Sequence, residues 1–340
     1  MISSVNRVAQ RRCFFYKIVM IIGLVMALTA CSLTPNKQQS AVNNLASDLN
    51  KAQLLLSKKD YQAAYQEYKT HAKNGNALAQ FSLALFYQNG WGRQVNQTRA
   101  CQWYEKAAQG KIPAAYQFYG DCLKQGIHRP VDSVAAIKAY ESAVSLGLFG
   151  SLCSIGELYI QGQGVIKDVP KGIVLCQQAA QKGSPVAAMR LADLFYQGID
   201  IKQDYKQAAQ WYAGLAERKI AKAQYRLAEI LHQGLGVNKN NQAARYWYES
   251  AAEQGYLEAY LPTAELYFYA EENPKNSKPL PAYTAKAYLW LTALLKRADN
   301  KELDLKAVNA LHKKVLNIMP KQWHVELDKK VEEHLKHIEL

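Results

Sequence analysis

The chain repeats itself every 36 residues, and this period constrains its fold more than any other feature of the sequence. A unit of this length cannot bury its apolar face alone, so it stacks on its neighbours and forms a solenoid. Solenoids typically present a long binding surface, so we expect a binding protein rather than an enzyme. The small residues that mark the period, each inside a segment with a helical pattern, are Ala84, Gly120, Gly156, Ala192, Ala228 and Ala264.

Six units begin near residues 79, 115, 151, 187, 223 and 259. The fifth reads AQYRLAEILHQGLGVNKNNQAARYWYESAAEQG, the third carries the loop GQGVIKD, and the fourth carries the helix KQAAQWY. Their shared pattern, A-x-x-x-L-[GA]-x-x-Y-x-x-G-x-G-V-x-x-D-x-x-K-A-x-x-W-Y-x-x-A-A-x-x-G, resembles the Sel-type repeat family, a branch of the tetratricopeptide-like solenoids. The resemblance implies an all-α fold, a right-handed superhelical solenoid of antiparallel helix pairs.

Particular residue types are suited to begin, end and pack the two helices of each unit. Glycines 126, 162, 198 and 234 are suited to end the first helices, and Asp132, Asp168, Asp204 and Asn240 are suited to cap the second ones. Gly120 and Gly156 allow two helices to approach closely. Trp103, Trp211, Trp247 and Trp290 fill the space between neighbours. The second unit has Ala139 at the tryptophan position, so we expect looser packing there.

The N-terminus has the features of a secretory leader. Four basic residues, Arg7, Arg11, Arg12 and Lys17, precede an apolar run over 18–30 that is too short to span a membrane. The run closes with Leu-Thr-Ala-Cys, which resembles the lipobox of bacterial lipoproteins. That resemblance implies an acylated Cys31 at the mature N-terminus, and Ser32 after it implies sorting to the outer membrane. An ordinary signal peptide with a chance cysteine is the alternative.

The sequence therefore predicts one elongated repeat domain behind a membrane anchor. The segment after the leader is polar, and the segment before the repeats resembles a tetratricopeptide hairpin. A proline-rich insertion over 271–282 delays the second helix of the sixth unit and should be exposed. The predicted divisions are a signal peptide over 1–30, a tether over 31–40, a helical hairpin over 41–76, six repeats over 77–300 and capping helices over 301–340.

Charge and motifs exclude several function classes. The chain carries a net charge of +14, and its leader accounts for four basic residues, which leaves +10 for the mature part. These charges are scattered and no nucleic-acid fold signature accompanies them, so we expect no nucleic-acid partner. No nucleophile elbow, phosphate loop or dinucleotide fingerprint occurs. His334 and His337 lack further ligands in the sequence. We expect no catalytic residue, metal, cofactor or small-molecule substrate.

Acidic residues follow the small position in five units, and glutamines come four residues later in four of them. At about 100° per residue, both positions project opposite the buried helix face. In tetratricopeptide-like arrays the first helices line the concave side, so these residues would form a polar ladder that could bind a protein segment. A merely solvated helix face is the simpler interpretation, and the sequence leaves both open. We call the first five of the following residues the acidic ladder: Asp121, Glu157, Asp193, Glu229, Glu265, Gln125, Gln161, Gln197 and Gln233.

Further side chains should face the same side, and they either contact a partner or pack between repeats. They are Phe81, Met189, Tyr225 and Leu261, with Tyr196 close by.

Four cysteines remain in the mature part besides Cys31. Cys101 and Cys122 lie at similar distances from the turn near Lys111, so they could sit level on antiparallel helices. Cys153 and Cys176 have the same relation to the turn near Val165. These spacings allow the disulfides Cys101–Cys122 and Cys153–Cys176, but buried free thiols that pack as small apolar residues are the favoured interpretation.

The sequence thus predicts a lipid-anchored adaptor of the bacterial cell envelope that binds a protein partner in its groove. The anchor should hold it at the outer membrane, facing the periplasm. The family resemblance implies assembly of envelope, polysaccharide-export or secretion complexes, or contact with host proteins. An envelope enzyme or accessory acting on peptidoglycan or β-lactams is the alternative, although the cysteine spacing of such relatives is absent. A carbohydrate-binding protein is a third reading.

Lipidation of Cys31 can be tested directly. The substitution Cys31→Ala should abolish metabolic labelling with a fatty acid, because the thiol and the new N-terminus of this residue are the acylation sites. Two or three acyl chains give stable membrane attachment, so the variant should also leave the membrane fraction. Labelling that persists in the variant would refute the lipoprotein assignment.

Overall fold

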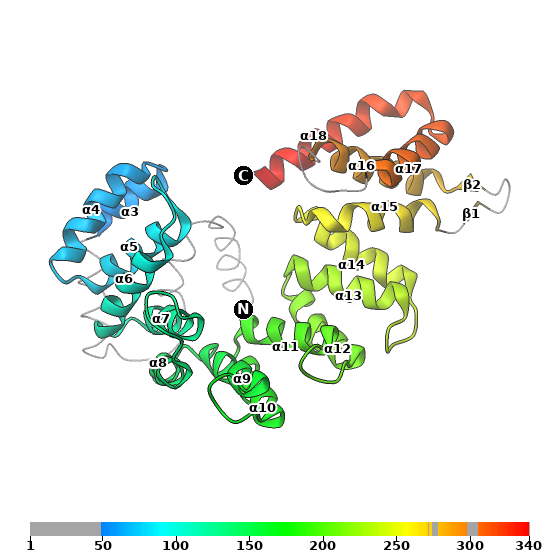
Figure 1. Ribbon diagram of the computed structural model, residues 1–340. Coiled ribbons are helices and arrows are strands. Elements are labelled where there is room, and N and C mark those ends of the chain that lie inside the picture. Colours follow the sequence, from blue (N-terminus) through cyan, green and yellow to red (C-terminus); the bar gives the residue numbers. More distant parts are fainter. Residues whose placement is uncertain (1–48, 271, 274–277, 298–304, 340) are drawn as a thin grey trace, which may run out of the picture. The chain divides into compact units, whose positions relative to one another are not determined.

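The computed structural model describes residues 49–270, 272–273, 278–297 and 305–339 (Figure 1). The predicted signal peptide, Cys31 and the tether lie outside these residues. The described chain is built from helices that pack in consecutive pairs, and its one pair of short strands, β1 (Glu272–Asn273) and β2 (Lys278–Pro279), borders the insertion. The all-α repeat fold is confirmed.

The structure divides into two compact units, Met1–Leu175 and Cys176–Leu340. The first contains α3 (Asn50–Ser57), α4 (Tyr61–Lys73), α5 (Ala77–Asn89), α6 (Gln97–Gln109), α7 (Pro113–Gln125), α8 (Ser133–Ser145), α9 (Ser151–Gln161) and the start of α10 (Val169–Gln181). The second contains the end of α10, α11 (Pro185–Gln197), α12 (Tyr205–Glu217), α13 (Ala221–Gln233), α14 (Asn241–Glu253), η2 (Leu257–Ala259), α15 (Tyr260–Phe268), α16 (Pro281–Arg297), α17 (Leu305–Ile318), η3 (Lys321–Trp323) and α18 (His324–Glu339).

The division into two units differs from the single elongated domain that the sequence predicts. In a repeat array each helix pair contacts only its neighbours, so no central core joins the first repeats to the last. The boundary falls inside α10, within the third repeat. The 36-residue period cannot indicate such a boundary, because it reports only what the repeats have in common.

The predicted helix ends are confirmed. Asp132, Asp204 and Asn240 each accept a hydrogen bond from the backbone N–H three residues later, at 2.8, 3.0 and 2.9 Å. Each cap satisfies a donor that the first turn of a helix leaves free. Gly198 and Gly234 end α11 and α13 in the left-handed conformation, with φ of 65° and 73°. A residue with a Cβ adopts that conformation at a cost.

The small positions are points of close helix approach, as predicted. A Cβ placed on Gly120 of α7 would lie 2.5 Å from Cε1 of Tyr140 on α8. Near Gly156 of α9, a Cβ placed on Gly172 of α10 would lie 2.4 Å from the Gly156 carbonyl oxygen. The two helices of a repeat therefore touch through the glycine backbone, which brings a large ring from the second helix against the first.

Large side chains fill the cores of both units. The tyrosines Tyr104, Tyr140, Tyr212 and Tyr248, spaced by 36 or 72 residues on the second helices, are at most 3% exposed. At the end of the chain, α17 and α18 pack on α16 and form the predicted capping helices. The cap also contacts the sixth repeat, where the Tyr260 hydroxyl of α15 and His334 Nε2 of α18 are 2.8 Å apart.

Two glycine substitutions should have opposite effects on stability. Gly120→Ala should lower the free energy of unfolding by about 1–3 kcal/mol, because the new methyl group overlaps the buried ring of Tyr140. Gly214→Ala, in α12 with open space around the added Cβ, should raise it by about 1 kcal/mol through helix propensity. Urea unfolding followed by circular dichroism measures both, and equal effects would contradict close packing at Gly120.

Candidate functional site

The residues of the predicted ladder lie on the first helices of the repeats. Asp121 and Glu157 belong to α7 and α9 in the first unit, and Asp193, Glu229 and Glu265 belong to α11, α13 and α15 in the second. The first four side chains are half-buried, whereas Glu265 is exposed. Gln125, Gln161, Gln197 and Gln233 are the last residues of α7, α9, α11 and α13, and all four are exposed.

Two carboxylates of the ladder accept hydrogen bonds from buried tyrosines of the same repeat. The Tyr140 hydroxyl donates to Asp121 Oδ1 at 2.7 Å, and the Tyr212 hydroxyl donates to Asp193 Oδ1 at 2.6 Å. Burial and the neighbouring Asp193 carboxylate raise the pKa of Tyr212. A buried hydroxyl without an acceptor costs free energy, so these carboxylates belong to the fold as well as to the surface.

The first and third repeats differ from this arrangement. In the first repeat Leu85 stands where the acid would be, and the Tyr104 hydroxyl donates to Gln88 Oε1. In the third repeat Cys176 replaces the tyrosine, and Glu157 instead lies 3.5 Å from the Lys124 ammonium. These pairs were not predicted from the sequence, although a 19-residue spacing between acid and tyrosine is visible in three repeats.

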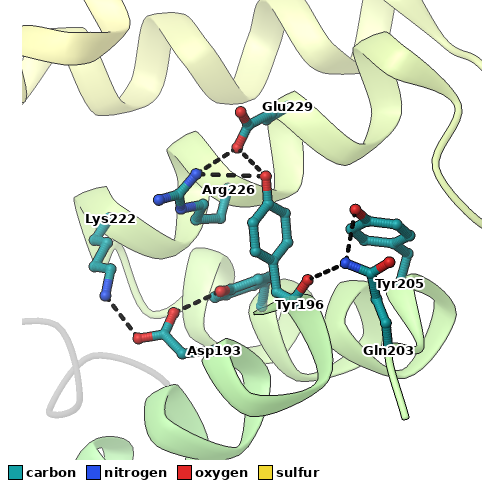
Figure 2. Close-up of polar contacts among 8 residues, drawn as sticks. Asp193, Tyr196, Gln203, Tyr205, Lys222, Arg226 and Glu229 are labelled. Carbon is teal, nitrogen blue, oxygen red and sulfur yellow. Dashed lines mark hydrogen bonds and ion pairs between the residues drawn. The ribbon is translucent and has the colours of Figure 1, made fainter. Parts of the chain in front are cut away.

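Polar contacts also join the first helices of the fourth and fifth repeats (Figure 2). The Lys222 ammonium of α13 lies 2.7 Å from Asp193 Oδ2 of α11. The Tyr196 hydroxyl of α11 donates to Glu229 Oε2 of α13 at 2.8 Å, and the Arg226 guanidinium donates to the same oxygen at 2.7 Å. Both carboxylates of the ladder in these repeats are therefore paired with a cation.

The electrostatic environment keeps this cluster in one protonation state near neutral pH. Burial and the Glu229 carboxylate raise the pKa of Tyr196 to about 12, so its hydroxyl remains a donor. Burial opposes the charge on Arg226, but the hydrogen bond and ion pair with Glu229 outweigh it and raise the pKa of the guanidinium. The hydroxyl donor of Tyr196 and the charge of Arg226, which both contact Glu229, therefore persist across the physiological range.

Aromatic rings surround the same guanidinium. Arg226 lies 4.8 Å from the ring centroid of Tyr196 and 5.6 Å from that of Tyr225. The Tyr225 ring is 5.3 Å from that of Tyr256. All four side chains are half-buried, with an accessible part. We call Tyr196, Tyr225, Arg226 and Tyr256 the tyrosine-arginine face.

The apolar side chains of the predicted groove have different environments. Phe81 is 3% exposed and its ring packs 5.6 Å from Tyr104 and 5.9 Å from Phe118, so core packing accounts for it. Tyr225 belongs to the tyrosine-arginine face, and Met189 and Leu261 are half-buried. The sequence left open whether Phe81 contacts a partner or packs inside the protein, and the structure supports packing.

The four cysteines of the repeats are buried. Cys101 of α6 and Cys122 of α7 form a disulfide with a Cα–Cα distance of 5.8 Å, which joins the first repeat to the second. Cys153 and Cys176 are also disulfide-bonded. They lie on either side of the boundary between the units, and their pairing with one another stays a prediction.

Within the described ranges, no group of three or more His, Cys, Asp or Glu side chains could hold a metal ion. Among the described helices none combines the length and the apolar character needed to cross a membrane.

Comparison with known proteins identifies the family. The Sel1 repeat matches residues 77–111, 113–148, 151–184, 185–217 and 221–256, about half of the chain, so the protein belongs to the Sel1 repeat family. The crystal structure of a Sel1 repeat protein from Oxalobacter formigenes is 25% identical, with 73% of this chain and 99% of that chain covered and a TM-score of 0.54. No curated protein matches this chain.

Further solved structures are more distant. A protective antigen present in uropathogenic Escherichia coli strains, which displays an SLR fold, is 24% identical over 87% of this chain and 63% of that chain, with a TM-score of 0.48. A putative Sel1 repeat protein from Klebsiella pneumoniae is 21% identical over 59% of this chain and 98% of that chain, with a TM-score of 0.40.

The family match covers five repeats, whereas the sequence predicts six. In the sixth, α15 and α16 pack as a helix pair, but the insertion around β1 and β2 separates them and breaks the 36-residue spacing. Sel1 repeat proteins generally mediate protein–protein interactions, and their scaffold is typically non-enzymatic. Tyr196, Tyr225 and Arg226 of the tyrosine-arginine face lie on the first helices of this scaffold, and Tyr256 directly precedes η2.

The bond between Asp193 and Tyr212 predicts a coupled pair of mutations. Asp193→Ala should lower the free energy of unfolding by about 1–3 kcal/mol, because the buried Tyr212 hydroxyl loses its acceptor. In a Tyr212→Phe background the same substitution should cost much less, because no donor remains. A double-mutant cycle from urea unfolding measures this coupling. Additive effects would show that Asp193 does not support the buried ring.

Proposed function

We propose that this protein is an adaptor of the bacterial cell envelope, held to the membrane by a lipid on Cys31, and that its tyrosine-arginine face binds a partner protein. The observation that carries the proposal is the position of the Arg226 guanidinium near the rings of Tyr196 and Tyr225. Its bond to Glu229 within α13 and the bond from Tyr196 of α11 to the same carboxylate hold it there. Family membership supports protein binding as the general activity.

The composition of this face favours protein recognition. Tyrosine and arginine are enriched among the residues that contribute most to interface energies, since they combine large rigid area with hydrogen-bonding groups. Immobilising flexible side chains on binding costs about 0.5–1.5 kcal/mol each. Arg226, Glu229 and Tyr196 are already ordered by one another in the free protein, so much of this cost is avoided.

The charges on this face indicate what the partner presents. Asp193 and Glu229 are neutralised by Lys222 and Arg226, so they offer little attraction to a basic segment. The exposed amides Gln197 and Gln233 follow at the ends of the same helices. Amide side chains and tyrosine rings suit a protein segment that offers its backbone groups and apolar side chains.

The envelope location rests on the leader and on the cysteines. The Leu-Thr-Ala-Cys closure motivates lipidation, and Ser32 favours the outer membrane with the repeats in the periplasm. The buried disulfide between Cys101 and Cys122 suits an oxidising compartment such as the periplasm. In that place an adaptor would serve the assembly of an envelope, polysaccharide-export or secretion complex, or contact with a host protein.

Site-specific crosslinking in intact cells tests the proposal. A photo-crosslinking residue at Gln197 or Gln233 should capture one defined partner. The same residue at Gln210 of α12 or Gln242 of α14 should not, because these equally exposed glutamines lie on second helices. Equal capture from both pairs would refute a binding face on the first helices.

Affinity measurements with the purified partner then test the role of Arg226. Arg226→Ala should weaken binding at least tenfold, because a central arginine packed between rings typically contributes above 1 kcal/mol. Arg218→Ala, at an exposed helix end, is the matched control and should leave affinity unchanged. Circular dichroism of both variants checks that the repeats stay folded. Unchanged affinity of a folded Arg226→Ala variant would remove this face from the interface.

A further inference from the structure

The second repeat lacks the large ring that the first, fourth and fifth repeats carry on their second helices. At this position, which recurs every 36 residues, the chain has Trp103, Ala139, Leu175, Trp211 and Trp247. The two indoles of Trp103 and Trp247 pack against the core clusters of their units. Replacement of an indole by a methyl group in an otherwise conserved framework leaves space unless the neighbouring helices move together.

That space remains open in the structure. A pocket of about 290 Å³ lies between α6, α7 and α8, and Ala139 is one of its lining residues. Ala108, Leu123 and Ala139 are at most 6% exposed and form its buried side, while the rings of Tyr116 and Tyr119 line it and are half-buried. The disulfide between Cys101 and Cys122 joins α6 to α7 and holds two of these helices together.

The lining selects for an aromatic group. Apolar cavities of about 150 Å³ bind benzene, and drug-sized ligands need about 300–1,000 Å³, so this pocket suits a single ring system. Tyr116 and Tyr119 can pack against such a ring, and aromatic pairs add about 0.5–1.5 kcal/mol beyond the area they bury. The first, fourth and fifth repeats place an indole at the equivalent position, so the repeat framework accommodates a group of that shape.

Charges at the pocket indicate what flanks the ring. The negative charge of Glu105 is compensated, because its carboxylate accepts a hydrogen bond from the Arg129 guanidinium at 2.6 Å. The Tyr119 hydroxyl also donates to this carboxylate at 3.2 Å, and His128 Nε2 lies 3.4 Å from it. Lys138 also lines the pocket, is exposed, and forms no ion pair among the residues that the structure describes. The pocket therefore carries an excess of positive charge.

We propose that this pocket, the repeat-two pocket, binds an aromatic side chain, best an indole, from an acidic segment of a partner protein. The inference rests on the proposed adaptor function and adds a second contact, in the first unit, with a defined specificity. The partner's aromatic ring fills the space beside Ala139, and acidic residues next to that ring in the partner segment form ion pairs with Lys138.

Blocked tripeptides test this specificity. Acetyl-Asp-Trp-Glu-amide should bind the full chain in lipid nanodiscs saturably at millimolar concentration, as measured by saturation-transfer NMR. Acetyl-Asp-Ala-Glu-amide should bind at least tenfold more weakly, because it leaves the pocket empty. Acetyl-Lys-Trp-Lys-amide should bind several-fold more weakly, and Lys138→Glu should reverse this preference. Binding of free indole without binding of the acidic peptide would overturn the proposal in favour of a small aromatic molecule.

A substitution that fills the pocket gives the decisive test. Ala139→Trp should abolish peptide binding, because the new indole occupies the site. Val134→Trp is the matched control, since it adds the same ring at an exposed position of α8 that does not line the pocket, and peptide binding should persist. If Ala139→Trp does not fold, Ala139→Leu fills part of the space and should weaken binding at least fivefold. Unchanged binding in a folded filling variant would refute the proposal.

The test is independent of the tyrosine-arginine face. Arg226→Ala lies in the second unit and should leave binding of the acidic tripeptide unchanged. Loss of tripeptide binding in Ala139→Trp, together with retained crosslinking at Gln233, would support both sites. Tripeptide binding that fails in the wild type while Gln233 still captures its partner would reject the repeat-two pocket alone.

Discussion

A hydrogen bond between a buried tyrosine and an acceptor on the other helix of the same repeat holds the polar framework of this protein together. Tyr140 and Tyr212 are fully buried, and each donates to an aspartate nineteen residues earlier in the chain. The small residue next to that aspartate lets the ring approach, as Gly120 does for Tyr140. Packing and hydrogen bonding therefore set the register of the two helices at one point, which is why neighbouring positions can repeat so regularly.

This interaction also determines which side chains are available for binding. A carboxylate that accepts from a buried hydroxyl must stay at the border between core and surface, and Asp193 uses its second oxygen for Lys222. The acidic ladder is therefore largely occupied by the fold in the fourth and fifth repeats. The side chains that this arrangement leaves accessible are the rings of Tyr196 and Tyr225, the guanidinium of Arg226, and the terminal glutamines. The fold and the proposed binding face share one cluster, so a test of the proposal needs substitutions that separate folding from binding.

Departures from the repeat pattern carry as much information as the pattern. Leu85 removes the acid of the first repeat, and Tyr104 turns to Gln88. Cys176 removes the tyrosine of the third repeat. Ala139 removes the tryptophan of the second, and the neighbouring helices do not close the space, in part because the disulfide and the Tyr140 contact fix α6, α7 and α8 around it. A repeat protein acquires a distinct site where one unit lacks what the others share.

Local features of the sequence were sufficient for the repeat period, the helix ends at Asp204 and Gly198, the close approach at Gly120 and the capping helices, because each depends on residues within one or two turns or on a regular spacing. The acidic ladder was placed on the correct helices, but its bonds were not predicted, because they depend on how closely two helices pack. The helical pattern of about 100° per residue shows on which face of the helix Asp193 lies. It does not show that Tyr212, nineteen residues later, comes to lie beside it. The open space at Ala139, the cation between two rings at Arg226 and the division of the chain inside α10 arise only when neighbouring helices pack in three dimensions, since each depends on distances between side chains that no periodicity encodes.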